Sequence, residues 1–326
     1  MEGIAGFARW PHYATHVRSV LDAIDPTLPL YAARTGSPWG PQPPPGWEPD
    51  VVIVAGFADL QAIQRWRPAK IVHLEHGAGQ TYEGITSPSY AGGKHRLLGT
   101  VDLFLTAGEH GAARWRDTYP DIPAVPVGAP KLDRHHRAPH GDGIVFTRHW
   151  DCRLVPETRS AVDHYRRALP DVIARLKADG HRVYGHTHPR CPQGMRRWWE
   201  QWGAEVLADE TEVFAHGGML VADNTSMIYE FAALDRPTVC LNAPWYRRDV
   251  HHGMRFWDLI PGPQVNEPDG LHDAISAAFL PQWGDTRRDV STVVYGAPVG
   301  SAGEIAAEAI RVALGGDGAG CENEQR

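Results

Sequence analysis

The sequence lacks any long hydrophobic run. No apolar segment approaches the roughly 18 residues that span a bilayer. The first ten residues, MEGIAGFARW, also lack the basic start and apolar core of a secretory signal. We therefore expect a cytoplasmic protein, and we leave open a peripheral position at the membrane.

Cysteine is scarce, with four residues in a chain of 326: Cys152, Cys191, Cys240 and Cys321. None forms a CxxC pair or has the spacing of a zinc site, so we interpret them as free thiols in a reducing compartment. His186 and His188 share a face of an expected strand, but zinc needs a third ligand that no neighbouring residue supplies. An Asp-x-Asp element is also missing. We therefore expect no metal and no other cofactor, and we expect activity to survive EDTA.

Positive charge is not in excess. The chain has 32 Lys and Arg against 39 Asp and Glu, a net charge of −7. This balance argues against a protein that wraps nucleic acid non-specifically. A nucleic-acid acceptor stays open only if the N-terminal half carries a local basic surface.

The chain does contain two runs of apolar strands alternating with helices. Such strands indicate parallel sheets covered on both faces. The polar segment KLDRHHRAPHGDG separates the two runs. We predict an α/β fold of two Rossmann-like, doubly wound parallel-sheet domains that face each other across a cleft. The predicted parts are domains over 1–135 and 141–300, a helix over 300–314 and a disordered tail over 315–326.

The individual elements follow from the same pattern. In the segment 158–180, a proline is expected to kink or split the helix. The other long helices are expected over 11–24 and 300–314. The expected strands are 3–8, 28–33, 50–57, 70–77, 101–108, 125–130, 143–150, 181–189, 204–209, 219–224 and 238–242.

One stretch, VADNTSMIYEFAALDRP (221–237), joins an expected buried strand directly to a helix. The small polar residues Asn224, Thr225 and Ser226 lie at this junction. Backbone N–H groups at the start of a helix have no partner within the helix, and together with hydroxyl groups they can bind a phosphate. The alternative is simple capping, in which Thr225 or Ser226 serves its own helix.

Other polar residues are expected at the same edge of the predicted sheets. His76 ends a strand in HLEHGAGQTY, where an imidazole suits a general base. In YGHTHPRC, a single histidine that contacts a phosphate or a leaving group is a better interpretation than a metal site. Arg247 and Arg248, in APWYRRDVHHGM, could carry charge to a diphosphate. Each of these residues could instead belong to an ordinary strand end or a solvated loop.

These motifs, in this order, resemble those of the CDP-glycerol glycerophosphotransferases, the teichoic-acid polymerase and primase family. HGAGQT resembles the family's HGTP element, VGAPKLD resembles GYPRND, and IVFTRHWDC resembles YAPTWR. ADNTSMIYEFAALDRPTV resembles SDYSSVMFDFALLDKP, and GHTHP and GSAGEIAAEAI give weaker matches. The resemblance extends from about residue 50 to residue 312. It implies the GT-B fold, with an acceptor domain followed by a nucleotide-donor domain.

The resemblance also implies roles for individual residues. His76 would act as the base, His188 would contact the transferred phosphate, and Asn224, Thr225 and Ser226 would hold the diphosphate. The implied activity is transfer of a polyol phosphate from a CDP-linked donor, such as CDP-glycerol, to an acceptor hydroxyl. The chain departs from the family at Arg148 and His149, at Asn224 and at Glu230, and its HGAGQT lacks the family's proline.

Three alternatives stay open. A GT-B glycosyltransferase would bind UDP or GDP at the same place, with Glu230 on the ribose. A non-catalytic nucleotide-binding protein would keep the fold, although the presence of His76 argues against it. A nucleotide-sugar 2-epimerase is disfavoured because ADNTSM lacks the Ser-Gly-Gly run of that fold's phosphate loop.

Overall fold

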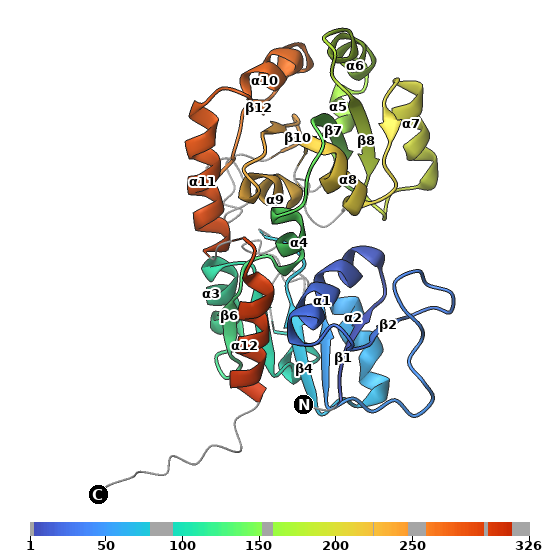
Figure 1. Cartoon of the computed structure of the whole chain (residues 1–326), viewed down its shortest axis with the longest axis vertical. Coiled ribbons are helices and arrows are strands. Elements are labelled where there is room, and N and C mark those ends of the chain that lie inside the picture. Colours follow the sequence, from blue (N-terminus) through green and yellow to red (C-terminus); the bar gives the residue numbers. More distant parts are fainter. Residues whose placement is uncertain are drawn as a thin grey trace, which may run out of the picture. The chain divides into compact units, whose positions relative to one another are not determined.

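The computed structural model describes residues 3–78, 94–151, 159–223, 225–246, 259–296 and 299–314. These residues divide into two compact units, which contain the elements labelled in Figure 1. Unit 1 holds residues 3–76, 94–131 and 301–314, and unit 2 holds 77–78 and the described part of 132–300. The tail expected at 315–326 lies outside the described residues. Within the described ranges, no helix is both long enough and apolar enough to cross a membrane.

Unit 1 is built on a six-stranded sheet in which each neighbouring pair of strands is parallel. The strand order β2-β1-β3-β4-β5-β6 reverses between β1 and β3. Ligands of open parallel sheets bind outside the carboxyl ends of the strands at such a reversal. The strands are β1 (Ile4–Ala8), β2 (Leu30–Ala32), β3 (Val51–Val54), β4 (Lys70–Leu74), β5 (Leu103–Thr106) and β6 (Ala124–Pro126).

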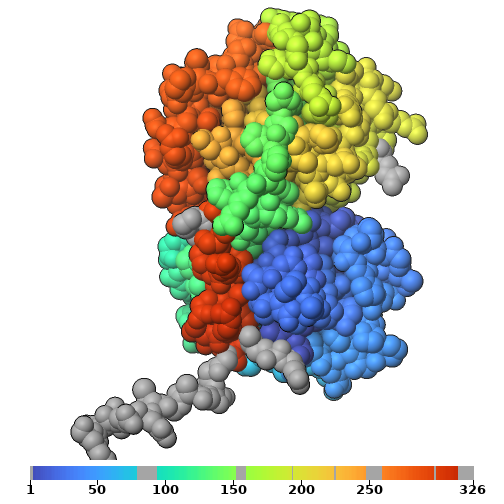
Figure 2. Space-filling model, in the orientation of Figure 1, coloured from blue at the N-terminus to red at the C-terminus, as the bar shows by residue number. Residues whose placement is uncertain are grey.

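Helices cover both faces of this sheet because successive strand side chains point to opposite faces. On one face, Ile4 and Ile53 belong to a core that includes α1 (Pro11–Ile24) and α12 (Ala302–Leu314). On the other face, the core includes α2 (Phe57–Ile63) and α3 (Glu109–Thr118). The red surface of α12 lies directly against the blue surface of α1 in Figure 2.

Unit 2 contains a second six-stranded sheet, again with only parallel neighbours. Its order, β12-β11-β10-β7-β8-β9, is that of a dinucleotide-binding Rossmann sheet, and it reverses between β7 and β10. The strands are β7 (Gly143–Arg148), β8 (Val183–Thr187), β9 (Glu205–Val206), β10 (Gly217–Ala222), β11 (Thr238–Leu241) and β12 (Gln264–Val265).

Both faces of this second sheet are also covered by helices. One face packs on α5 (Val162–Tyr165), α6 (Leu169–Ala178), α7 (Arg196–Gln201) and α10 (Leu271–Ala277). On the other face, α8 (Glu210–His216) contacts β7 and β10, and α9 (Met227–Ala233) contacts β10 and β11. Phe214 of α8 and Phe231 of α9 stack there with ring centroids 5.4 Å apart. Helix α11 (Gln282–Tyr295) packs against α9.

The predicted fold class is confirmed: two parallel sheets, each with helices on both faces. The helix expected over 158–180 is split into α5 and α6, and Pro170 lies in the first turn of α6, where its missing N–H loses no bond. The polar segment after Pro130 is more regular than predicted, because it contains α4 (Asp133–His136). The described residues also include short 3-10 turns: η1 (Gln64–Trp66), η3 (Leu98–Thr100), η4 (Pro130–Leu132), η6 (Gln193–Met195) and η8 (Pro268–Gly270).

Candidate functional site

The reversal between β7 and β10 in unit 2 is organised by Asp223, the residue that follows β10. Its carboxylate is fully buried and accepts hydrogen bonds from Ser160 Oγ at 2.5 Å and from the backbone N of His149 at 3.2 Å. Burial raises the pKa of Asp223 to about 6, although these hydrogen bonds oppose the shift. Asp223 therefore fixes the first residue after β7 to the end of β10.

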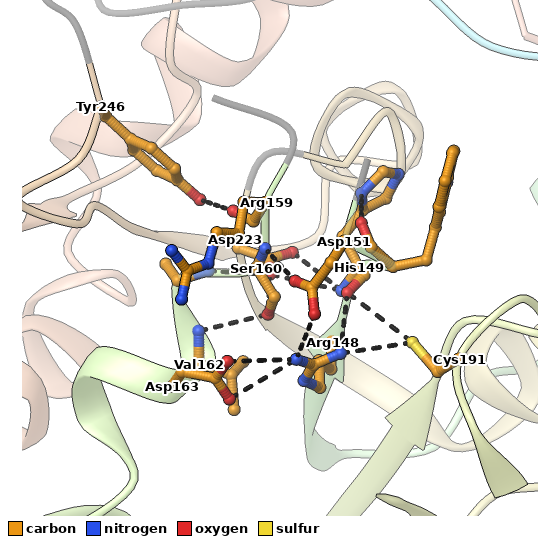
Figure 3. A network of polar contacts seen from close by, with 12 residues as sticks. Arg148, His149, Asp151, Arg159, Ser160, Val162, Asp163, Cys191, Asp223 and Tyr246 are labelled. Carbon is orange, nitrogen blue, oxygen red and sulfur yellow. Dashed lines mark hydrogen bonds and ion pairs between the residues drawn. The ribbon is translucent and has the colours of Figure 1, made fainter. Parts of the chain in front are cut away.

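Arg148, the last residue of β7, lies in the same network (Figure 3). Its buried guanidinium donates to Asp151 at 3.1 Å and to Asp163 at 3.3 Å. Burial opposes the charge, but these two carboxylates raise the pKa of Arg148 above its ordinary value. The cation is therefore balanced inside the protein and braces the chain between β7 and α5.

Cys191 lies next to this cation, with its Sγ 3.4 Å from Nη1 of Arg148. Burial raises the pKa of the Cys191 thiol to about 11, and the nearby Arg148 reduces the shift only in part. A thiol with this pKa carries little thiolate at neutral pH, so it is a poor nucleophile. Cys191 and Cys240 are free thiols, whereas Cys152 and Cys321 lie outside the described residues.

His188 follows β8, the strand next to β7. Its backbone N donates to the carbonyl of Arg148 at 2.9 Å, which extends the pairing of the two strands. The backbone N of Arg190 donates to Nδ1 of His188 at 3.1 Å. The His188 ring lies 5.2 Å from the ring of His149, centroid to centroid. The ends of β7 and β8 thus bring two imidazoles together.

The junction after β10 shows local capping. The backbone N of Thr225 donates to the carbonyl of Asp223 at 2.7 Å, and Thr225 Oγ1 accepts from the N of Met227 at 3.4 Å. Ser226 makes no side-chain capping bond to α9. At Thr225, the structure therefore shows the simple capping that the sequence left as the alternative to phosphate binding. Asn224 lies outside the described residues.

The remaining residues predicted for the donor site are Glu230, Arg247 and Arg248. Glu230 is buried within α9. The pKa of Tyr295 in α11 is raised mainly by the burial of Tyr295, and the charge of Glu230 is the next largest cause. Arg247 and Arg248 lie outside the described residues.

In unit 1, His76 lies two residues beyond the end of β4, close to the reversal between β1 and β3. Its Nδ1 is 2.7 Å from the carbonyl oxygen of Ala55, which follows β3. The ring of Tyr13 packs against the His76 ring at 4.5 Å, and that of His16 lies at 6.4 Å. A Cβ at Gly56 would overlap the Tyr13 ring, so this position needs glycine for the close packing.

His186 does not join His188 in one site. Its Nδ1 lies 2.9 Å from Oγ1 of Thr147 inside unit 2, and burial lowers its pKa to about 4. His188 lies beyond the strand and makes the separate contacts described above. Across the described residues, no group of three or more His, Cys, Asp or Glu side chains is arranged to hold a metal ion.

The sequence patterns missed Asp223 as an organising residue and Glu75 as a shifted carboxyl group. Glu75 accepts from the backbone N of Ala107 at 3.1 Å and from Nε1 of Trp115 at 3.0 Å. Burial raises its pKa to about 7, and these two bonds oppose the shift. The sequence signal that could have identified both residues is that each acid directly follows an apolar strand.

No protein-family model and no curated protein matches the chain. Solved structures match along nearly its whole length. A co-structure of S. aureus MnaA with UDP has a TM-score of 0.64 at 13% identity, covering 97% of both chains.

Two further structures give similar matches. The wall teichoic acid polymerase TagF has a TM-score of 0.64 at 12% identity, covering 95% of this chain and 88% of its own. A UDP-N-acetylglucosamine 2-epimerase has a TM-score of 0.57 at 12% identity, covering 95% of both chains. At these identities the similarity shows the fold, which is the GT-B fold of these proteins, and it does not single out the CDP-glycerol family.

Proposed function

We propose that this protein is a transferase that moves a polyol phosphate, similar to glycerol phosphate, from a CDP-linked donor to an acceptor hydroxyl. The observation that carries the proposal is that backbone groups hold His76 and His188 in opposite tautomers. Each tautomer suits the role that the sequence resemblance implies for that histidine.

His76 suits a general base. A carbonyl oxygen can only accept, so the 2.7 Å contact with Ala55 requires that Nδ1 of His76 carries a proton. In the neutral ring, Nε2 then has the lone pair that can take a proton from an acceptor hydroxyl. The Tyr13 ring at 4.5 Å supports this orientation.

His188 suits a hydrogen-bond donor to phosphate. A backbone N–H can only donate, so the 3.1 Å bond from Arg190 requires that Nδ1 of His188 is the acceptor. The neutral ring then carries its proton on Nε2, where it can donate to a phosphate oxygen. In the proposal, Asn224, Thr225, Ser226, Arg247 and Arg248 contribute to binding the donor diphosphate.

The proposed reaction follows from these roles. His76 removes the proton of the acceptor hydroxyl, and the oxygen attacks the phosphorus distal to the cytidine. The bond from that phosphorus to the bridging oxygen breaks, and CMP leaves with the electron pair. Hydrogen bonds to the phosphate oxygens stabilise the transition state, which is the main task of a protein in phosphoryl transfer.

Sugar transfer from a UDP- or GDP-linked donor is the second candidate. It is favoured by the match to a UDP co-structure with the same TM-score as the match to TagF. In that case Glu230, which is buried in α9, would bind the ribose.

Thermal unfolding with CDP-glycerol, CDP-ribitol, CMP, UDP-glucose, UDP and GDP tests the proposal. A ligand at about a hundred times its dissociation constant stabilises the folded state by roughly 2.7 kcal/mol. We expect a shift with the cytidine compounds alone, lost in His188→Ala and kept in His76→Asn, which should lack only turnover. A shift with UDP or GDP compounds alone would overturn polyol-phosphate transfer in favour of sugar transfer.

A further inference from the structure

His149 lies at the point where the Rossmann sheet of unit 2 changes direction, and the proposed reaction gives it no role. It is the first residue after β7, which lies between β10 and β8 in the sheet. Its backbone N is held by the Asp223 carboxylate at 3.2 Å, and the next residue but one after Asp223 is Thr225. The backbone of His149 is therefore held at the end of β10, two residues before Thr225, which the proposed function assigns to the donor phosphates.

The contacts of the His149 ring set its direction. Its Nδ1 lies 2.9 Å from the carbonyl oxygen of Trp150, so Nδ1 carries a proton. Figure 3 shows the His149 imidazole pointing away from the guanidinium of Arg148, which is directed toward Asp163 and Cys191. Arg148 is thus used for internal bracing, whereas the imidazole of His149 lies at the strand end near His188.

The two imidazoles have a spacing that suits a phosphate. Their centroids are 5.2 Å apart and their planes are inclined by 59°. Charge-assisted hydrogen bonds to phosphate are about 2.7–2.9 Å long. Two rings at this spacing can therefore reach different oxygens of one phosphate or of a diphosphate.

We infer that His149 is a second phosphate-binding residue, which acts with His188 as a pair of imidazoles that binds the diphosphate of the ligand. The inference rests on the donor site of the proposed function and adds a dependence on pH. His188 donates from Nε2 in its neutral form, whereas Nε2 of His149 can donate only when the ring is protonated. The pair therefore binds phosphate most tightly when His149 is an imidazolium.

The charged groups around His149 decide whether the dependence of phosphate binding on its protonation can be measured. On β7 and α5, the charge of Arg148 is balanced by Asp151 and Asp163. After β10, Asp223 holds the backbone of His149, and since its pKa is raised to about 6 it also titrates in the tested range. The wild type and the His149 variants share this contribution, so the comparison between them removes it. After β8, the guanidinium of Arg190 lies 4.9 Å from the centre of the Trp150 ring, and the thiol of Cys191 is neutral near pH 7 because its pKa is raised to about 11.

Calorimetric titration of the whole chain with inorganic pyrophosphate and with CDP, at about pH 6 and pH 8, tests the inference. The amide of Asn can replace Nδ1 of His149 but not Nε2, so His149→Asn keeps the bond to Trp150 and removes the phosphate donor. We expect about tenfold weaker binding at pH 6, since a charge-assisted bond contributes about 1.5–3 kcal/mol. We also expect a smaller loss at pH 8, where a smaller fraction of the His149 rings is protonated than at pH 6.

Two further variants make the result specific. His149→Gln, whose amide can reach the place of Nε2, should restore part of the binding and lose the extra dependence on pH. His140→Asn is the matched control. Nδ1 of His140 also bonds to the carbonyl of the next residue, at 2.8 Å, but His140 lies before the amino end of β7, whereas His149 follows its carboxyl end. This variant should bind as the wild type does.

The outcomes separate this inference from the proposed function. If His149→Asn and His149→Gln both bind pyrophosphate and CDP as tightly as the wild type at both pH values, the inference is wrong and the proposed function is untouched. If pyrophosphate binding depends on His149 while only the UDP or GDP compounds shift thermal unfolding, the imidazole pair stands and the cytidine donor is wrong. Should His149→Asn fail to fold, His149→Gln still tests the inference, because it should lose the extra dependence of binding on pH; a pH dependence equal to that of the wild type would overturn the inference.

Discussion

At the scale of single residues, the backbone partner of a histidine decides what the ring can do. His73 and His186 lie inside strands, where burial lowers the pKa of each to about 4, so both are neutral at physiological pH. His76, His149 and His188 lie just beyond strand ends, and each Nδ1 is engaged by a backbone group. These three rings thus have defined tautomers, and they lie at the carboxyl ends of strands of the two sheets, where ligands of such folds bind.

The carboxyl group of Glu75 should make the stability of unit 1 depend on pH. Its pKa is raised from 4.5 to about 7, so the folded state holds a proton that the unfolded state releases between those values. The stabilisation is complete below about pH 4.5 and is lost as the pH rises through 7. The stability of the wild type relative to Glu75→Gln should fall by about 2 kcal/mol from pH 5 to pH 8.

Urea unfolding of both proteins at several pH values in this range measures the difference. The comparison with Glu75→Gln removes the contributions of other titrating groups, which the two proteins share. If the wild type instead became more stable relative to Glu75→Gln as the pH rises, Glu75 would stabilise the fold as a carboxylate, contrary to its raised pKa.

At the scale of elements, close packing of α7 on β8 depends on the absence of a side chain at Gly185. A Cβ there would overlap the ring of Trp199, which is buried and donates from Nε1 to Oγ1 of Thr187 at 2.9 Å. Gly185→Ala should therefore destabilise unit 2 by about 1–3 kcal/mol, as overpacking of a core does.

The matched control is Gly270→Ala, where an added Cβ meets nothing within 4 Å and φ is −85°. Far-UV circular dichroism during denaturation should show a lower midpoint for Gly185→Ala and little change for Gly270→Ala. Equal midpoints for Gly185→Ala and the wild type would mean that Trp199 can move away at no cost.

Elements with a strong apolar period were predictable from the sequence, and the others were not. Most strands and α1 lie within their predicted spans. The prediction for β10 (Gly217–Ala222) began two residues too late and that for β6 (Ala124–Pro126) one residue too late, and the two-residue strand β12 (Gln264–Val265) was not predicted. Helix α11 was missed because only Arg287, Val290, Val294 and Tyr295 of its 14 residues are buried. At the candidate site, the sequence indicated His76 and His188. It did not indicate the hydrogen bond from the backbone N of His149 to Asp223, because that bond joins residues 74 positions apart.

At the scale of the whole molecule, unit 1 is discontinuous in sequence. The chain passes into unit 2 at Leu132 and returns to unit 1 at Ser301, and α12 then packs beside α1 and over β5. Ala306 and Ile310 are fully buried in the core of unit 1. The folding of unit 1 therefore depends on residues at both ends of the described chain.

Replacement of Ile310 tests this dependence. Ile310→Ala should destabilise unit 1 by about 2–4 kcal/mol, since it leaves a cavity in the core. Hydrogen exchange should become faster in β1 and β3 and stay unchanged in β7 and β10. Val312→Ala, at a position 70% exposed on the same helix, is the control and should alter neither unit. Faster exchange in β7 and β10 as well would contradict separate stabilities for the two units.

The return of the chain at α12 also has a consequence for biosynthesis. A ribosome completes all six strands of unit 1 before it makes any strand of unit 2, and it reaches α12 only after all the strands of unit 2. At about 5–20 residues per second, translation of unit 2 takes roughly 10–30 s. For that time the apolar residues of unit 1 that α12 later covers, beside α1, stay exposed to solvent.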